Sequence, residues 1–191
     1  MNYKKFNNLV DLFLDTAKKH KPEEVFLEWL NPVNRKKFTW LETISQVNKL
    51  SNKLKKYVRE GDRVLLVSEN RPEWLISDLA IMKAKAITVP AYTTYTEADY
   101  KYQIEDCEPT VVILSNNIIH KKLEKIIHEK NFIKAVITFD AVSSGNYNDK
   151  YFHFSSLLKN DLLQKDNVTE IEIKRTDPAC IIYTSGTGGN P

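Results

Sequence analysis

The residues best suited to chemistry lie near the carboxyl end of the sequence, in the run Thr184-Ser185-Gly186-Thr187-Gly188-Gly189. Three of the five glycines in the chain fall in this run. Glycines let several backbone N–H groups converge on one point, and Ser and Thr hydroxyls add donors. The preceding apolar run, Ala179-Cys180-Ile181-Ile182-Tyr183, predicts a buried strand. A buried strand that leads into a Ser/Thr/Gly loop commonly holds a phosphate, so we interpret residues 184–189 as a phosphate-binding loop.

Two well-known phosphate-binding motifs do not fit this loop. Gly186 is not followed at Walker A spacing by a Gly-Lys-Ser/Thr ending. The dinucleotide fingerprint normally follows the first strand of its fold, whereas this loop comes after several strand–helix units. A flexible polar tail is the remaining alternative. The apolar strand before the loop, its mixed Thr, Ser and Gly content and the stiffening Pro191 favour a binding loop.

The middle of the sequence predicts the sheet that positions this loop. Short apolar runs, predicted to be strands, lie at 64–67, 86–90, 111–114 and 133–139. Amphipathic segments, predicted to be helices, lie between them, and two of these are 96–107 and 117–130. Continuous apolar strands that alternate with helices are typical of a parallel sheet covered by helices on both faces. The fold class is therefore predicted to be α/β. A polar loop at 141–150, a short helix at 155–164 and an irregular connection at 165–177 complete the chain.

The first part of the chain predicts a helix at 8–20, then two short strands at 26–29 and 37–39 joined by a turn at Asn31-Pro32. Three helix starts carry recognisable capping residues, in each case a polar residue followed three positions later by an acidic one. These pairs are Thr39 with Glu42, Asn70 with Glu73, and Thr96 with Asp99.

Composition and charge exclude several classes of protein. With 191 residues, 42% hydrophobic content and a net charge of +3, the chain suits a globular α/β protein. Its lysines alternate with acidic residues, so no nucleic-acid surface is predicted, although weak attraction to an anionic membrane surface stays open. No run reaches the roughly 18 apolar residues of a membrane span, and no signal peptide is present, so we expect a cytoplasmic protein.

Cysteine and histidine offer no catalytic or metal centre. Cys107 and Cys180 are expected to be buried, inert thiols rather than a disulfide or zinc site. The histidines have no partner at metal-ligand spacing. Three of them, His20, His120 and His128, are expected on polar helix faces. We therefore predict that no cysteine or histidine of this chain is a metal ligand or a catalytic residue.

The terminal loop resembles the signature loop of the acyl-adenylate-forming superfamily, which includes acyl-CoA synthetases, luciferases and peptide-synthetase adenylation domains. The family pattern is Tyr-Thr-Ser-Gly-Thr-Thr-Gly-x-Pro-Lys-Gly, and the chain follows it from Tyr183 to Pro191 with one departure. Gly188 stands where Thr is usual, so one hydroxyl is lost. The pattern's Lys and final Gly come after the residues given.

Upstream segments extend the resemblance over nearly the whole chain. Phe38–Glu42 and Gly61–Val64 are similar to a helix start and a strand start of the family, and Ser68–Trp74 with Ala86–Tyr92 resembles the long-chain fatty acid–CoA ligase branch. The resemblance implies that residues 1–191 form the N-terminal part of the large AMP-binding domain. Within it, 1–60 would be the opening helices and short strands, 61–140 the strand–helix units, 141–177 a connection, and 178–191 the signature strand and loop.

The resemblance also implies an activity for the parent protein. ATP and Mg²⁺ would convert a fatty acid to an acyl-adenylate, and coenzyme A would then release AMP and form the thioester. Residues 184–189 would hold the β- and γ-phosphates, and the chain alone is expected to be inactive. Three alternatives remain: a ligase for an aryl, short-chain or amino acid, a truncated module without catalysis, and an unrelated nucleotide-binding α/β protein. Oligomeric state is not predicted.

Overall fold

A parallel sheet forms the centre of the fold in the computed structural model, which describes residues 6–30, 35–142, 149–159 and 172–184. The sheet has five strands in the order β4-β3-β5-β6-β7, and all its neighbours pair in parallel. The strands are β3 (Arg63–Val67), β4 (Ile87–Ala91), β5 (Val111–Leu114), β6 (Ala135–Thr138) and β7 (Tyr151–His153). A separate antiparallel pair is formed by β1 (Val25–Trp29) and β2 (Lys36–Thr39).

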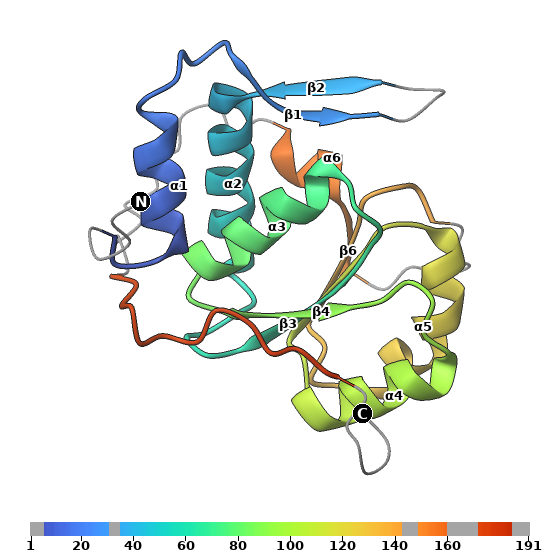
Figure 1. Cartoon of the computed structure of the whole chain (residues 1–191). Coiled ribbons are helices and arrows are strands. Elements are labelled where there is room, and N and C mark those ends of the chain that lie inside the picture. Colours follow the sequence, from blue (N-terminus) through green and yellow to red (C-terminus); the bar gives the residue numbers. More distant parts are fainter. Residues whose placement is uncertain (1–5, 31–34, 143–148, 160–171, 185–191) are drawn as a thin grey trace.

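Helices cover both faces of the five-stranded sheet, as the sequence predicts (Figure 1). The helices are α1 (Leu9–Ala17), α2 (Trp40–Leu54), α3 (Pro72–Lys83), α4 (Glu97–Cys107), α5 (Asn117–Glu129) and α6 (Phe154–Leu158). Residues of α1, α2, α3 and α6 form one core with one face of the sheet, and residues of α4 and α5 form a second core with the other.

The alternation of side chains along each strand produces these two cores. Val64 and Leu66 of β3 belong to the first core, whereas Leu65 and Val67 belong to the second, and all four are fully buried. Successive side chains of a strand point to opposite faces, so a strand covered on both faces must be apolar throughout. The continuous apolar runs in the sequence therefore predicted the fold class correctly.

Two of the three predicted helix caps are present. The hydroxyls of Thr39 and Thr96 accept hydrogen bonds from the backbone N–H groups of Glu42 and Asp99, and those carboxylates accept from the threonine N–H groups in return. The third prediction was wrong. Arg71, not Asn70, is the N-cap of α3, and no side chain caps that helix.

Pro72 explains this difference. Proline is favoured at the first helical position because it has no N–H to leave unsatisfied and its φ angle is already helical. Pro72 occupies that position, so the residue before it becomes the cap. Glu73 is then free to pair with the Arg71 guanidinium rather than to close a capping box.

The sequence did not predict β7, a strand of three residues beside β6. The segment Tyr151–His153 follows a polar loop and is too short to show a periodic pattern. The expectation that His120 lies on a polar helix face was also wrong. Its side chain is fully buried in α5, near Tyr151 of β7.

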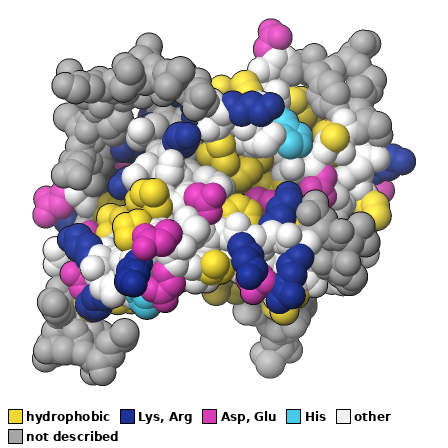
Figure 2. Space-filling model, turned by 90° about the horizontal axis from the view of Figure 1, so that it is seen from above, with side chains coloured by type: hydrophobic (Ala, Val, Ile, Leu, Met, Phe, Trp, Pro, Cys, Tyr) yellow, Lys and Arg dark blue, Asp and Glu magenta, His cyan; other side chains and the backbone are white. Residues whose placement is uncertain are grey.

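The described surface carries charges of both signs. Figure 2 shows Lys and Arg side chains interspersed with Asp and Glu on the face seen from above, with hydrophobic side chains gathered near its middle. Among the described residues, no helix is long and apolar enough to cross a membrane.

Candidate phosphate-binding site

The stretch that leads to the predicted phosphate loop lies along the outer edge of β4. The Thr88 N–H donates to the Ala179 carbonyl at 3.1 Å, and the Ile181 N–H donates to the Thr88 carbonyl at 2.9 Å. These bonds form a parallel bridge between Thr88 and Cys180. This stretch therefore runs parallel to β4, as expected for the strand predicted at 179–183, but it pairs with β4 through one isolated bridge.

Burial of this stretch was predicted wrongly. Cys180 is exposed, and Ile182 is 65% exposed. The reason is its position, because the stretch is the outermost segment at this edge among the residues that the structure describes. Only alternate side chains can then face the protein, and Ile181 and Tyr183 pack against the core formed with α4 and α5.

Two polar contacts hold this edge in place. The Thr88 hydroxyl donates to the Asp78 carboxylate of α3 at 2.7 Å. Burial raises the pKa of Asp78, and the Thr88 hydrogen bond partly offsets that by favouring the carboxylate. On the other side, the Tyr183 hydroxyl donates a hydrogen bond to the Asp106 carboxylate of α4.

A turn precedes the edge stretch. The Lys174 N–H donates to the Asp177 carboxylate at 2.9 Å, and the Asp177 N–H donates to the Lys174 carbonyl at 3.1 Å. The same carboxylate lies 3.7 Å from the Lys85 ammonium, which also contacts Glu60 at 2.8 Å. The stretch from 174 to 183 thus contacts the turn after α3, then β4, and then α4.

Of the six predicted phosphate-binding residues, the structure describes Thr184, which is exposed directly after the Tyr183 anchor. Ser185, Gly186, Thr187, Gly188 and Gly189 lie outside the described residues. Within the described part of the chain, no three His, Cys, Asp or Glu side chains come together to hold a metal ion.

A second cluster lies beyond the carboxyl ends of β3 and β6, and sequence reasoning did not find it. The Arg71 guanidinium binds Glu73 through Nε at 2.9 Å and Nη2 at 3.2 Å, and binds Asp140 through two contacts of 3.1 Å. It also stacks near Trp29, with 4.7 Å to the ring centroid, and near Phe139 at 5.3 Å. The sequence signal for the Arg71–Glu73 pair was the run Arg71-Pro72-Glu73. This run is compatible both with a helix that begins at Pro72 and with a capping box.

The electrostatics of this cluster favour a fixed, charged arginine. Burial alone would lower the pKa of Arg71, but its bonds to Glu73 and Asp140 outweigh that effect and raise it. The Arg71 side chain is 3% exposed. Because all its strong contacts are internal, we interpret Arg71 as a structural residue that fixes the start of α3 beside an open cavity of about 440 Å³ lined by Trp29, Leu30 and Asn70.

The strand order creates a topological switch point between β3 and β5. There the chain changes from adding a strand on one side of β3 to adding strands on the other side. The helix after β3 packs on one face of the sheet, and the helix after β5 packs on the other. Ligands of doubly wound α/β domains bind beyond the carboxyl ends of strands at such points. The Asn116 amide there donates to the Glu69 carboxylate at 3.4 Å, which joins the two strand ends.

Comparison with known proteins identifies the class. The fold is a doubly wound α/β domain, and the chain belongs to the AMP-binding enzyme family, whose model matches residues 13–191. An acetyl-coenzyme A synthetase of Leptospira biflexa is 30% identical over 96% of this chain and 30% of its own length. A long-chain fatty acid–CoA ligase of Mycobacterium tuberculosis is 30% identical over 70% of this chain and 22% of its own.

Solved structures agree on the fold. The anthranilate CoA ligase AuaEII, solved with anthranoyl-AMP, superimposes with a TM-score of 0.78 at 23% identity, over 97% of this chain and 33% of that one. The coronafacic acid ligase of Pectobacterium brasiliense gives a TM-score of 0.79 at 17% identity, over 94% of this chain and 33% of that one. The chain spans about a third or less of the length of these proteins.

Proposed function

We propose that residues 1–191 are the N-terminal part of the large domain of an ATP-dependent acid–CoA ligase whose substrate is a long-chain fatty acid. Membership of the AMP-binding enzyme family carries this proposal. Because the chain spans 30% of the length of its acetyl-coenzyme A synthetase relative, the activity is proposed for the whole protein that contains it. ATP, Mg²⁺ and coenzyme A would be its small-molecule partners, and the cytoplasm its location.

The proposed reaction places a specific demand on residues 184–189. The carboxylate of the acid attacks the α-phosphorus of ATP, the bond to the β-phosphate oxygen breaks, and pyrophosphate leaves with the electron pair. Backbone N–H groups and hydroxyls aimed at the leaving charge would stabilise that step without reorganisation. The contact of Tyr183 with Asp106 supports this role, because it fixes the residue directly before the loop.

Two classes of carboxylic acid are candidates for the substrate. The segment Ser68–Trp74, similar to the long-chain branch, supports a long aliphatic acid, as does the long-chain ligase relative. A short-chain acid is the second candidate. It is favoured by the Leptospira relative, which matches a larger share of the chain.

A substrate panel separates these candidates. The complete protein that contains this chain would be assayed for acid-dependent exchange of pyrophosphate into ATP with acetate, octanoate and palmitate. We expect the highest kcat/KM with palmitate. A preference for acetate would replace the long-chain proposal, and no exchange with any carboxylic acid would contradict the ligase proposal itself. Ser185→Ala and Thr187→Ala are expected to lower kcat by roughly ten- to a hundredfold by removing donors to the leaving phosphates.

A further inference from the structure

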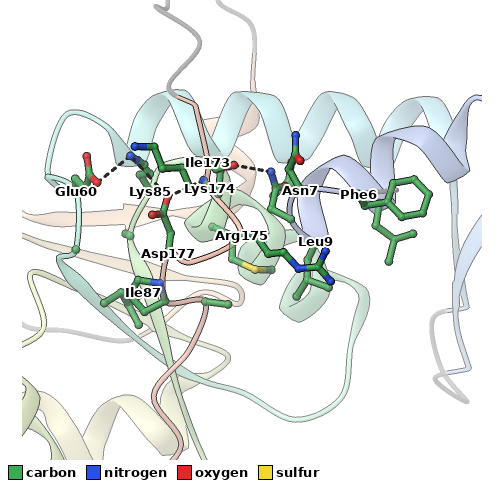
Figure 3. A pocket seen from close by; sticks show the side chains of 18 residues that line it. Phe6, Asn7, Leu9, Glu60, Lys85, Ile87, Ile173, Lys174, Arg175 and Asp177 are labelled. Carbon is green, nitrogen blue, oxygen red and sulfur yellow. Dashed lines mark hydrogen bonds and ion pairs between the residues drawn. The ribbon is translucent and has the colours of Figure 1, made fainter. Parts of the chain in front are cut away.

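A cavity of about 420 Å³ lies at the amino ends of β3 and β4 (Figure 3). Three parts of the chain line it: the first turn of α1 with the residues before it, the segments that lead into β3 and β4, and the stretch 173–179. Its volume falls within the range of sites that hold small molecules. The fold and the proposed reaction give this cavity no role.

One wall of the cavity is apolar and belongs to the protein core. Val10, Met82, Ala86 and Ile87 contribute to it, and each is buried. Leu9 stands at the mouth and is 54% exposed. An aliphatic group placed here would remove exposed apolar surface from water, which favours its binding.

The charged groups around the cavity are not equivalent. The Lys85 ammonium is neutralised by Glu60 and Asp177, at 2.8 and 3.7 Å, and its side chain is 10% exposed. The guanidinium of Arg175, by contrast, has no ion pair or hydrogen bond with any residue in the described part of the chain. Figure 3 shows Arg175 reaching from the stretch 173–179 toward Leu9 of α1.

The geometry points to a binding site for an aliphatic monocarboxylate, and we propose that this cavity takes one. The alkyl chain would lie on the wall formed by Val10, Met82 and Ile87, and the carboxylate would accept two parallel hydrogen bonds from Arg175. A single negative charge suits the site, because Glu60 and Asp177 at the other end would repel a polyanion. This proposal does not depend on the ligase reaction.

A bound ligand would also stabilise the stretch that leads to the predicted phosphate loop. The cavity wall includes Pro178 and Ala179, and the Ala179 carbonyl accepts the hydrogen bond from Thr88. A ligand held between α1 and the stretch 173–179 therefore stabilises the backbone directly before the edge pairing with β4. Amide hydrogen exchange of residues 179–183 is expected to slow when the site is filled.

The test measures binding of decanoate to the purified chain by titration calorimetry and by two-dimensional NMR. We expect saturable binding, with shift changes centred on 85–87 and 173–177. Decanol, which lacks the charge, and acetate, which lacks the chain, are expected to bind at least about tenfold more weakly. Absence of saturable decanoate binding up to about 1 mM, or equal affinity for decanol, would overturn the proposal.

Two variants and a matched control locate the site. Arg175→Gln is expected to weaken decanoate binding by about tenfold or more, because bidentate hydrogen bonds to a charged group are lost. Leu9→Trp is expected to weaken it by filling the mouth, and Leu9 is exposed enough to be changed without unfolding the chain. Arg35→Gln removes an equally charged, exposed arginine in the β1–β2 hairpin and is expected to change nothing. Equal weakening by Arg35→Gln would show non-specific attraction and refute the proposal.

Discussion

The hydroxyl of Tyr183 donates a hydrogen bond to the carboxylate of Asp106, and this contact joins the end of the sheet-edge stretch to α4. The Tyr183 ring also meets Tyr102 edge-on, with 6.2 Å between ring centroids. Thr184, the first residue of the predicted phosphate loop, follows immediately. Tyr183, directly before the predicted loop, is therefore held by a contact with a helix as well as by its position at the sheet edge.

Tyr183→Phe tests this dependence because it removes the hydroxyl and keeps the ring. We expect faster amide exchange in residues 181–184 and a loss of about 1 kcal/mol in the free energy of unfolding. Tyr102→Phe is the matched control, since it keeps the edge-on ring contact and leaves Asp106 its donor. Equal exchange in the two variants would show that the hydrogen bond does not position this segment.

The same contact has a defined pH dependence. Burial, and then the hydrogen bond to Asp106, raises the pKa of Tyr183. A raised folded pKa means that the stabilisation is complete below the unfolded value of about 10 and is lost as the pH rises through the folded value. Above about pH 10, the difference in stability between the wild-type chain and Tyr183→Phe should therefore shrink.

The cluster of Arg71, Glu73 and Asp140, beyond the carboxyl ends of β3 and β6, should contribute strongly to the stability of the fold. Arg71→Met keeps the aliphatic stem but leaves the Glu73 carboxylate, which is 9% exposed, without its partner. Removing one member of a buried ion pair costs about 3–5 kcal/mol. Asp140→Asn is expected to cost less than about 1 kcal/mol, because the Asp140 side chain is 49% exposed. Urea unfolding measures both, and equal costs would contradict this account.

The three predicted caps can be compared directly by substitution. Thr39→Ala and Thr96→Ala each remove an observed capping hydrogen bond and should lower the free energy of unfolding by about 1 kcal/mol. Asn70→Ala should change it by less than about 0.5 kcal/mol, because Asn70 is exposed and does not cap α3. A cost for Asn70→Ala as large as that for Thr39→Ala would support the capping role that the sequence pattern predicts for Asn70.

The sequence was most informative where a pattern has one physical solution. An uninterrupted run such as Val111–Leu114 must be buried on both faces, and this predicted the parallel sheet. Thr96 with Asp99 predicted a helix start because both partners of the reciprocal cap are local in sequence. The family resemblance was confirmed over residues 13–191.

Long-range partners decided the features that were missed or predicted wrongly. Asp140 pairs with Arg71 across 69 positions, so no local pattern predicts Asp140 as a partner of Arg71. Cys180 lies in an apolar run of the sequence, yet its side chain is exposed. Its burial depends on the place of this run in the sheet, next to the outer edge of β4. His120 is buried and contacts Tyr151 of β7, and β7 itself is only three residues long.

Burial of His120 predicts a loss of stability in mild acid. Desolvation lowers the pKa of His120 and neighbouring His128 adds to this, while Glu124 opposes it. A lowered folded pKa means that the unfolded chain binds the proton more readily, so stability is complete above the unfolded value of about 6.5 and is lost as the pH falls below it. Between about pH 7 and 5, His120→Leu should therefore show a flatter decline than the wild-type chain.

The control for this prediction is His20→Gln, because His20 is exposed beside Glu24. It should leave the pH dependence of unfolding close to that of the wild-type chain. A wild-type slope retained in His120→Leu would mean that other groups, such as buried carboxyls, dominate the acid response.

The two thiols should differ sharply in reactivity. Cys107 is 6% exposed, and burial raises the pKa of its thiol to about 11. Cys180 is exposed at the sheet edge. The thiolate is the reactive form, so the raised pKa lowers the thiolate fraction of Cys107 at neutral pH, and its burial blocks access of the reagent. Labelling with a disulfide reagent should show one fast thiol per native chain and two in denaturant. Cys180→Ser should abolish the fast phase, and Cys107→Ser should retain it. Fast labelling of the Cys180→Ser chain would show that burial does not protect Cys107.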